Sequence, residues 1–164
     1  MTVLQRLRPD HAPALLAFER ENRAYFAASV PDRGDDYFTS FEARHAELLA
    51  EQAAGAHHFH VLADGDGAVL GRVNLVDVDG GSAELGYRIA ERAAGRGLAT
   101  SGVREVCAAA FSEYGLTVVR ARTTSDNTGS RAVLERTGFV ETGATTLMGK
   151  PALRFTRELS EAGG

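Results

Sequence analysis

A glycine-rich turn is the segment whose residue types point most directly to chemistry. It reads Ala94-Gly-Arg-Gly-Leu-Ala99 and lies between an expected strand and an expected helix. The first turn of a helix offers unpaired N–H groups and a partial positive charge, and glycines let an anion approach them without an intervening Cβ. Arg92 and Arg96 could add charge-assisted contacts to phosphate oxygens. The turn therefore predicts a pyrophosphate or another anion held by the backbone, with a tightly packed helix-capping turn as the alternative.

Two other groups of residues carry weaker chemical signals. His57, His58 and His60 could form a metal cluster, but strand alternation places His58 and His60 on one face and His57 on the other. No carboxylate at ligand spacing accompanies them, so we interpret the segment as an ordinary strand and expect no metal. Cys107, the single cysteine, lies among apolar residues in a helical pattern and is interpreted as a buried small hydrophobe.

Three consecutive antiparallel strands are the central prediction for the elements that position the turn. Their residues follow period-two patterns and are separated by glycine-rich hairpin turns. The three strands are expected at 57–64, 68–78 and 83–90. A helix is then expected from Leu98 to Gly115, followed by a strand at 116–123. A strand, helix and strand in this order imply a parallel pair joined by a right-handed crossover.

The remaining elements complete a mixed sheet with helices on both faces. Strands are expected at 3–7, 138–148 and 152–159, and helices at 10–28, 37–54 and 128–136. Asp10 is the expected cap of the first helix, and Leu15, Phe18 and Tyr25 are expected on one buried face. The order is β-α-α-β-β-β-α-β-α-β-β, an α/β (α+β mixed sheet) class. We expect one domain over residues 1–160 and a frayed tail at 161–164.

Composition excludes several functional classes. The chain has 164 residues, of which 44% are hydrophobic and 24% charged, as expected for a globular protein with one core. Its net charge of −4 and the absence of a Lys/Arg cluster disfavour direct nucleic-acid binding. No segment has the pattern of a signal peptide or a membrane span, so we expect no membrane partner. A single cysteine is compatible with the cytoplasm, the location we expect.

Two segments of the sequence resemble the GNAT superfamily of acyl-CoA-dependent N-acetyltransferases. They are YRIAERAAGRGLATSGVREVCAAAF at 87–111 and TTSDNTGSRAVLERTGF at 123–139, and the resemblance extends more weakly over residues 3–159. The family motif Gln/Arg-x-x-Gly-x-Gly/Ala fits from Arg92 or from Ala94. We prefer the second register, because Gly97 then begins the helix. The resemblance implies that the backbone of the turn binds the pyrophosphate of acetyl-CoA and that the preceding strand pairs with its pantetheine amides.

The second segment departs from the family pattern at one position. It contains Asn127-x-x-Ser130, and in many family members the residue equivalent to Asn127 contacts the cofactor. The position of Leu134 is often a tyrosine that reprotonates the CoA thiolate, which leucine cannot do. Together with ENRAYFAASVP at 21–31, this pattern is similar to the RimJ/RimL-like branch, which includes acetyltransferases of ribosomal-protein N-termini.

Direct acetyl transfer from a thioester to an amine needs a neutral amine, a donor to the developing oxyanion and a proton source for the thiolate. Glu84 is the candidate base, acting directly or through a water, with a solvent-facing residue or a partner of a nearby arginine as the alternative. Ser130 is the candidate proton donor, with a side chain that bonds the helix backbone as the alternative. A splayed strand at 84–90 could offer a backbone N–H to the thioester carbonyl.

The resemblance implies acetyl-CoA as cosubstrate and a primary amine as acceptor, on a protein N-terminus or on a small molecule such as an amino acid, a polyamine or an antibiotic. A non-catalytic acyl-CoA-binding or sensory module is the alternative. The first two helices and the 30–36 loop would shape the acceptor pocket. A monomer or a homodimer is expected, the latter paired through an exposed strand at 152–159. The expected cofactor-binding residues are Tyr87, Arg88, Ile89, Ala90, Arg92, Gly95, Arg96, Gly97, Leu98, Ala99, Thr100, Asn127 and Ser130.

Overall fold

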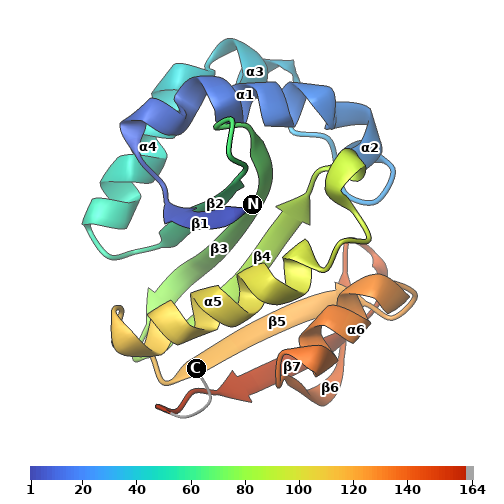
Figure 1. Cartoon of the computed structure of the whole chain (residues 1–164). Helices are drawn as coiled ribbons and strands as arrows, with labels where there is room; N and C mark the ends of the chain where they lie inside the picture. Colours follow the sequence, from blue (N-terminus) through green and yellow to red (C-terminus); the bar gives the residue numbers. More distant parts are fainter. Residues whose placement is uncertain (162–164) are drawn as a thin grey trace.

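The computed structural model describes residues 1–161 and places one mixed sheet between two layers of helices (Figure 1). The strands are β1 Val3–Arg6, β2 His58–Ala63, β3 Val69–Asp79, β4 Ser82–Ile89, β5 Val118–Thr124, β6 Val140–Leu147 and β7 Lys150–Glu158. The helices are α1 Ala12–Glu21, α2 Arg23–Ala27, α3 Asp35–Thr39, α4 Phe41–Ala53, α5 Leu98–Ser112 and α6 Thr128–Arg136, with short 3₁₀ turns η1 Pro9–His11 and η2 Glu91–Ala93. Of the tail expected at 161–164, residues 162–164 lie outside the described residues.

The sheet combines two antiparallel parts across one parallel pair. Its strand order is β1-β2-β3-β4-β5-β7-β6. Strands β2, β3 and β4 form the expected antiparallel meander, and β4 and β5 form the expected parallel pair connected through α5. The expectation of an exposed terminal strand at 152–159 is wrong. Strand β7 folds back from a turn at Met148 and Gly149 and pairs with β5 along its length, which leaves β6 at the edge.

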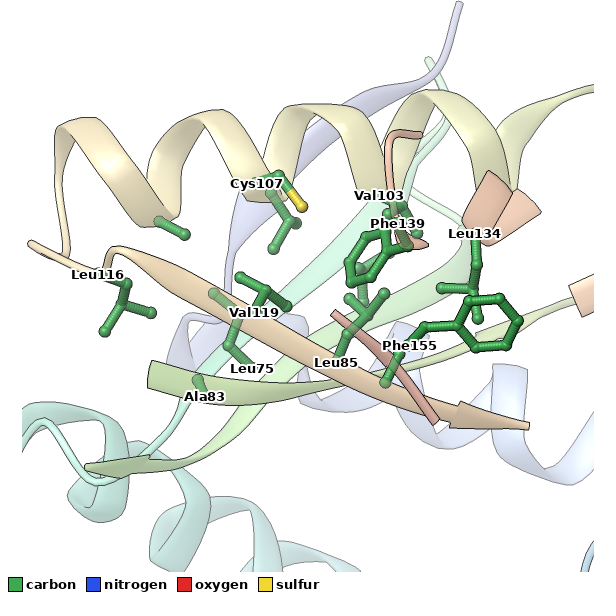
Figure 2. Packing of buried hydrophobic residues seen from close by; sticks show 14 of the residues in the cluster. Leu75, Ala83, Leu85, Val103, Cys107, Leu116, Val119, Leu134, Phe139 and Phe155 are labelled. Atoms are coloured by element: carbon green, nitrogen blue, oxygen red, sulfur yellow. The ribbon is translucent and has the colours of Figure 1, made fainter. Parts of the chain in front are cut away.

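Each face of the sheet has its own apolar core. Helices α5 and α6 cover one face, where Val103 and Cys107 of α5 pack over Leu75, Leu85 and Val119 (Figure 2). Cys107 is therefore the buried small hydrophobe that the sequence predicts, and burial raises the pKa of its thiol. Helices α1 and α4 cover the opposite face, with a second cluster built around aromatic and aliphatic side chains.

The helix expected at 10–28 is broken in the structure. It begins as η1, becomes α1 and breaks at Asn22 before α2. The side-chain amide of Asn22 donates to the carbonyl of Phe18 at 2.9 Å, a local hydrogen bond that competes with regular helix geometry. Asp10 does not cap α1, because His11 occupies the cap position and the Asp10 carboxylate pairs with Arg8 at 3.0 Å.

Two further expectations for the N-terminal helices need correction. Tyr25 is exposed, while its neighbour Phe26 is buried and packs against Phe18. Phe26 continues the buried helical steps of Phe18 and Asn22 across the break, whereas Tyr25 lies one position away from them. The helix expected at 37–54 divides at Ser40 into α3 and α4.

Candidate active site

Strands β4 and β5 separate in the middle of the sheet. They pair only at Ser82, Ala83 and Glu84, although β4 stays paired with β3 as far as Ile89. Figure 1 shows the two strands diverging towards the N-terminal end of α5. From Leu85 onward, the edge of β4 that faces β5 therefore has backbone groups without a strand partner in the described chain. The sequence anticipates this separation for the strand at 84–90, and Gly86 is exposed there despite its central position.

The glycine-rich turn forms a cradle at the start of α5. Gly95 and Gly97 have φ angles of +78° and +76°, a left-handed conformation that favours glycine. No atom outside the turn lies within 4 Å of the position that a Cβ would occupy at either glycine. Gly97 caps α5, and the first backbone bond of the helix runs from the Ser101 N–H to the Gly97 carbonyl at 3.0 Å. The predicted helix start is confirmed, and the turn is open rather than tightly packed.

The cradle has the backbone donors of an anion-binding site. The N–H groups of Leu98, Ala99 and Thr100 precede the first intrahelical bond and remain available to an anion. Arg92 and Arg96 lie at the same turn: Arg96 donates to the Arg92 carbonyl at 2.9 Å, and Arg92 pairs with Glu21 at 3.4 Å.

A pair of hydroxyl groups lies at the gap on the α5 side of the sheet. The Tyr87 hydroxyl donates to Ser130 Oγ at 3.2 Å, and burial raises the pKa of Tyr87. Asn127 caps α6 by accepting the Ser130 N–H at 3.0 Å. Leu134 is buried in the core beside Phe155 (Figure 2) and presents no polar group to the gap. The structure thus brings Tyr87 and Ser130 together where the sequence lacks the usual tyrosine.

Glu84 lies on the opposite face of β4, beside an arginine. Its Oε2 accepts from Arg122 Nη2 at 2.7 Å, so the arginine pairing considered for it is present. Glu84 lines a surface hollow of about 250 Å³. The other polar residues of this hollow are Arg120, Arg122, Thr142, Arg154 and Thr156. Arg122 fixes the orientation of this carboxylate, and the hollow leaves it accessible to water and to an incoming amine.

A buried ionic cluster on this same face was not predicted. The Glu19 carboxylate is 1% exposed and binds Arg72 at 2.8 Å, Arg33 at 3.0 Å and Arg88 at 3.3 Å. Burial by itself would raise the pKa of Glu19, but the guanidiniums of Arg72 and Arg33 outweigh it and hold that pKa below its ordinary value. The Arg88 side chain therefore points away from α5, so that only its backbone borders the gap.

The remaining predicted residues of β4 lie at the end of the strand. Ile89 packs between the two cores, and Ala90 is buried with its N–H bonded to the Leu70 carbonyl at 2.8 Å. Their side chains are structural, and a contact with a ligand would involve the backbone.

The three histidines divide between the faces as alternation predicts. His58 stacks on Tyr114 with ring centroids 3.8 Å apart, and His60 Nε2 lies 2.6 Å from the Tyr114 hydroxyl. His57 instead accepts the Asp77 N–H at 3.0 Å. Among residues 1–161, no three His, Cys, Asp or Glu side chains are grouped closely enough to hold a metal ion. Within the same range, no helix combines the length and apolar character needed to cross a membrane.

Comparison with known proteins gives a consistent result. Residues 2–140 match the family model of the acetyltransferase (GNAT) domain. YjcK of Bacillus subtilis, named a probable N-acetyltransferase, is 30% identical over 135 residues, which cover 78% of this chain and 74% of the relative. YdaF of the same organism, named as a candidate ribosomal N-acetyltransferase, is 39% identical over 131 residues, covering 76% and 67%. RimJ of Mycobacterium smegmatis, solved with a CoA disulfide, superimposes with a TM-score of 0.84 at 26% identity, over 96% of this chain and 81% of that chain.

Proposed function

The chain belongs to the GNAT family of N-acetyltransferases, and from that premise we propose that it transfers an acetyl group from acetyl-CoA to a primary amine by direct attack. The amine nitrogen forms a bond to the thioester carbonyl carbon, and the bond from that carbon to sulfur breaks. The amine loses one proton and the CoA sulfur gains one, so the products are an amide and free CoA.

The separation of β4 from β5 is the observation that carries this proposal. It connects the anion cradle at Gly97 and the hydroxyl pair on one face with Glu84 on the other. Bound acetyl-CoA supplies the activated acetyl group as its thioester. The cradle holds the pyrophosphate on the α5 amides, and the unpaired edge of β4 offers hydrogen bonds to the pantetheine amides. A backbone N–H of the same edge would stabilise negative charge on the carbonyl oxygen.

We assign the two proton transfers to residues on opposite faces. Glu84 accepts the amine proton, directly or through a water, and Arg122 orients its carboxylate. Ser130 donates a proton to the sulfur, and the Tyr87 hydroxyl, 3.2 Å away, replaces the proton that Ser130 gives up. Solvent water then returns a proton to Tyr87 and takes one from Glu84, which restores both groups. The hydroxyl pair would thereby take the role that Leu134 cannot fill.

The acceptor in this proposal is a protein N-terminus or a small-molecule amine. A ribosomal-protein N-terminus is the acceptor class that the name of YdaF suggests. A cytoplasmic location and a monomeric or homodimeric state stay part of the proposal.

Ligand-dependent melting tests the cosubstrate. Millimolar acetyl-CoA should raise the melting temperature, because a ligand that binds only the folded state stabilises it, whereas NAD and ATP should do less. Absence of a shift with any CoA ester would refute the proposal at its first step.

Release of the free CoA thiol distinguishes an enzyme from the alternative, a non-catalytic acyl-CoA-binding module. The buried Leu134 favours one rival, an acyl-CoA-binding module that has lost its acid. A panel of N-terminal peptides and small amines should yield thiol release with at least one acceptor. Binding of acetyl-CoA without turnover on any acceptor would support the module instead.

Variants of the two proposed proton-transfer residues test the mechanism. Glu84→Gln and Ser130→Ala should each lower kcat about a hundredfold, the usual scale of general acid–base catalysis, with the KM for acetyl-CoA nearly unchanged. Glu84→Gln should also remove the fall in rate at low pH. An unchanged pH–rate profile would exclude Glu84 as the base, and full activity of Ser130→Ala would exclude Ser130 as the donor. Arg104→Gln, on the exposed side of α5, serves as the control.

A further inference from the structure

The face of the sheet that carries Glu84 is rich in guanidinium groups. Three arginines surround Glu19, and three more line the hollow that contains Glu84. These six residues are Arg33, Arg72, Arg88, Arg120, Arg122 and Arg154. They face the carboxylates of Glu19 and Glu84. Arg23, which also lines the pocket of Arg33 and Arg88, is paired with Asp32 and Asp35, so these ion pairs together leave a surplus of guanidinium groups in a chain whose net charge is −4. A local surplus of charge of this kind selects ligands by sign.

The Glu19 cluster is only partly neutralised from within. One carboxylate faces three guanidiniums, and Arg72, 6% exposed, holds it at 2.8 Å. Arg88 makes the longest of the three contacts, at 3.3 Å, and its side chain is 23% exposed. The Arg88 guanidinium also lies 4.8 Å from the centre of the Phe26 ring, which orients its plane. Arg88 is therefore an oriented and solvent-accessible cation. Its counterion, the Glu19 carboxylate, is shared with two other arginines.

Arg88 lies on the same face of β4 as the proposed base Glu84, with only Gly86 between them on that face. Glu84, Gly86 and Arg88 alternate along β4 on one face, at steps of about 6.6 Å. Gly86 has no side chain, is exposed and has no neighbouring atom within 4 Å of its Cβ position. An open floor thus separates the carboxylate that would receive the amine proton from the accessible guanidinium. Because an extended peptide advances about 3.3 Å per residue, its second or third residue would lie over this floor when its amine reaches Glu84.

We propose that the acceptor carries a negatively charged carboxylate close to its amine, in a peptide at the second or third residue, and that Arg88 together with Arg33 binds this group. The inference rests on the proposed function and adds the chemical class of its acceptor. Carboxylate and guanidinium match in shape and charge and form two parallel hydrogen bonds. Polyamines are poor acceptors under this proposal, because their additional cationic groups would meet the arginines of this face.

Peptide acceptors of matched length test the charge preference. Ser-Glu-Glu-Ala, Ser-Gln-Gln-Ala and Ser-Arg-Arg-Ala, each with an amidated C-terminus, differ only in charge at the second and third residues. We expect kcat/KM for the acidic peptide to exceed that of the neutral peptide about tenfold, with the basic peptide and spermidine below both. Glutamic acid α-amide compared with glutamine α-amide repeats the test for a small-molecule acceptor, because only the first of these two amines carries a carboxylate.

Variants locate the preference on the protein. Arg88→Gln should lower kcat/KM for the acidic peptide to the value for the neutral peptide, which removes the tenfold difference. Arg33→Gln should reduce the difference, and it provides a second variant on a loop if Arg88→Gln fails to fold. Arg104→Gln removes a guanidinium from α5 and should keep the full preference.

Binding of the same peptides to the CoA-bound protein separates this inference from the proposed function. A preference in binding without turnover would retain the acidic-acceptor inference and reject the enzyme. Turnover with equal rates for the acidic and neutral members of both pairs would overturn the inference and leave the enzyme in place. A preference for spermidine, or one that persists unchanged in Arg88→Gln and Arg33→Gln, would also overturn it.

Discussion

The two faces of the sheet each bury a titratable side chain, and they treat its charge in opposite ways. On the α5 face, His60 is neutral: burial lowers its pKa from 6.5 to about 4. His60 Nδ1 lies 3.0 Å from the Val73 carbonyl, which can only accept, so Nδ1 carries the proton of the neutral ring. Nε2 is then unprotonated and accepts from the Tyr114 hydroxyl. On the opposite face, Glu19 is charged and held by three arginines.

This difference in buried charge bears on how the two faces of the sheet could bind different ligands, acetyl-CoA on the α5 side and the acceptor on the other. On the α5 side, the α5 amides and the hydroxyls of Tyr87 and Ser130 are uncharged polar groups near the gap, although Arg157 is also buried on this face. A face built on ion pairs requires an excess of cations around Glu19, because a buried carboxylate is stable only when it is well compensated. The charge surplus that we assign to acceptor selection is thus also part of the folding of α1 onto the sheet.

Removal of the Glu19 charge should have the largest effect on stability. Glu19→Gln leaves Arg72 buried without a counterion, and we expect a loss of about 3–5 kcal/mol in the free energy of unfolding, measured in urea. Glu21→Gln removes an exposed carboxylate two residues away on α1 and should cost less than about 0.5 kcal/mol. Equal losses for the two variants would show that the cluster around Glu19 is not a structural centre.

Acid titration should separate the stability contributed by His60 from that contributed by Glu19, because the two contributions are lost over different ranges of pH. The unfolded chain protonates His60 near pH 6.5 and the folded chain only near 4, so the stability held by neutral His60 falls as the pH drops through this window. The expected loss is about 3 kcal/mol, and His58 and His11, whose pKa values are also lowered by burial, add to it in the same direction. The Glu19 contribution is lost at lower pH, as the pH falls through its depressed pKa.

His60→Gln isolates the contribution of the α5 face. The variant should flatten the pH dependence of the unfolding free energy between pH 6.5 and about 4, and His57→Gln should leave it unchanged. An equally steep slope in His60→Gln would mean that other groups account for the acid sensitivity.

A substitution at the anion cradle should have a smaller and more specific effect. Gly97→Ala adds a Cβ where the pyrophosphate would bind and should raise the KM for acetyl-CoA about tenfold, with a stability cost of about 1 kcal/mol from the left-handed backbone. Gly115→Ala introduces comparable strain at φ +67° beyond the far end of α5 and should leave that KM unchanged. If the two variants raise the KM equally, strain in α5 rather than the cradle controls binding.

Local sequence patterns predicted the parts of the fold that depend on local structure. Gly97 marks the start of α5 because only a residue that tolerates positive φ suits its cap, and alternation separates His57 from His60. The position of β7 between β5 and β6 depends on pairing between distant segments, which no local pattern encodes. The break at Asn22 arises from one side-chain hydrogen bond within an otherwise helical sequence.

The site was predictable where it depends on backbone geometry and was missed where it depends on long-range charge. The open turn was predicted from its spacing and Ser130 was proposed from the family resemblance, but no pattern indicated the cluster, which joins Glu19 to arginines 14, 53 and 69 residues away. A signal was present: Ala12, Leu15, Glu19 and Asn22 follow one another at helical steps on the buried face. A charged residue on such a face requires a partner, and the sequence does not say which arginine provides it.

The Asn22 side chain connects the end of α1 to the turn that precedes α5. While its amide nitrogen binds the Phe18 carbonyl, its Oδ1 accepts the Glu91 N–H at 3.0 Å, at the first residue of the turn that leads to Gly97. The end of α1, which carries Glu19, is thereby connected to the loop that would bind the cosubstrate under the proposed function. The connection is a single side chain that is 3% exposed. If the proposed sites are correct, a change in this loop on cosubstrate binding would reach the acceptor side through Asn22, and linkage would require an equal effect in the opposite direction.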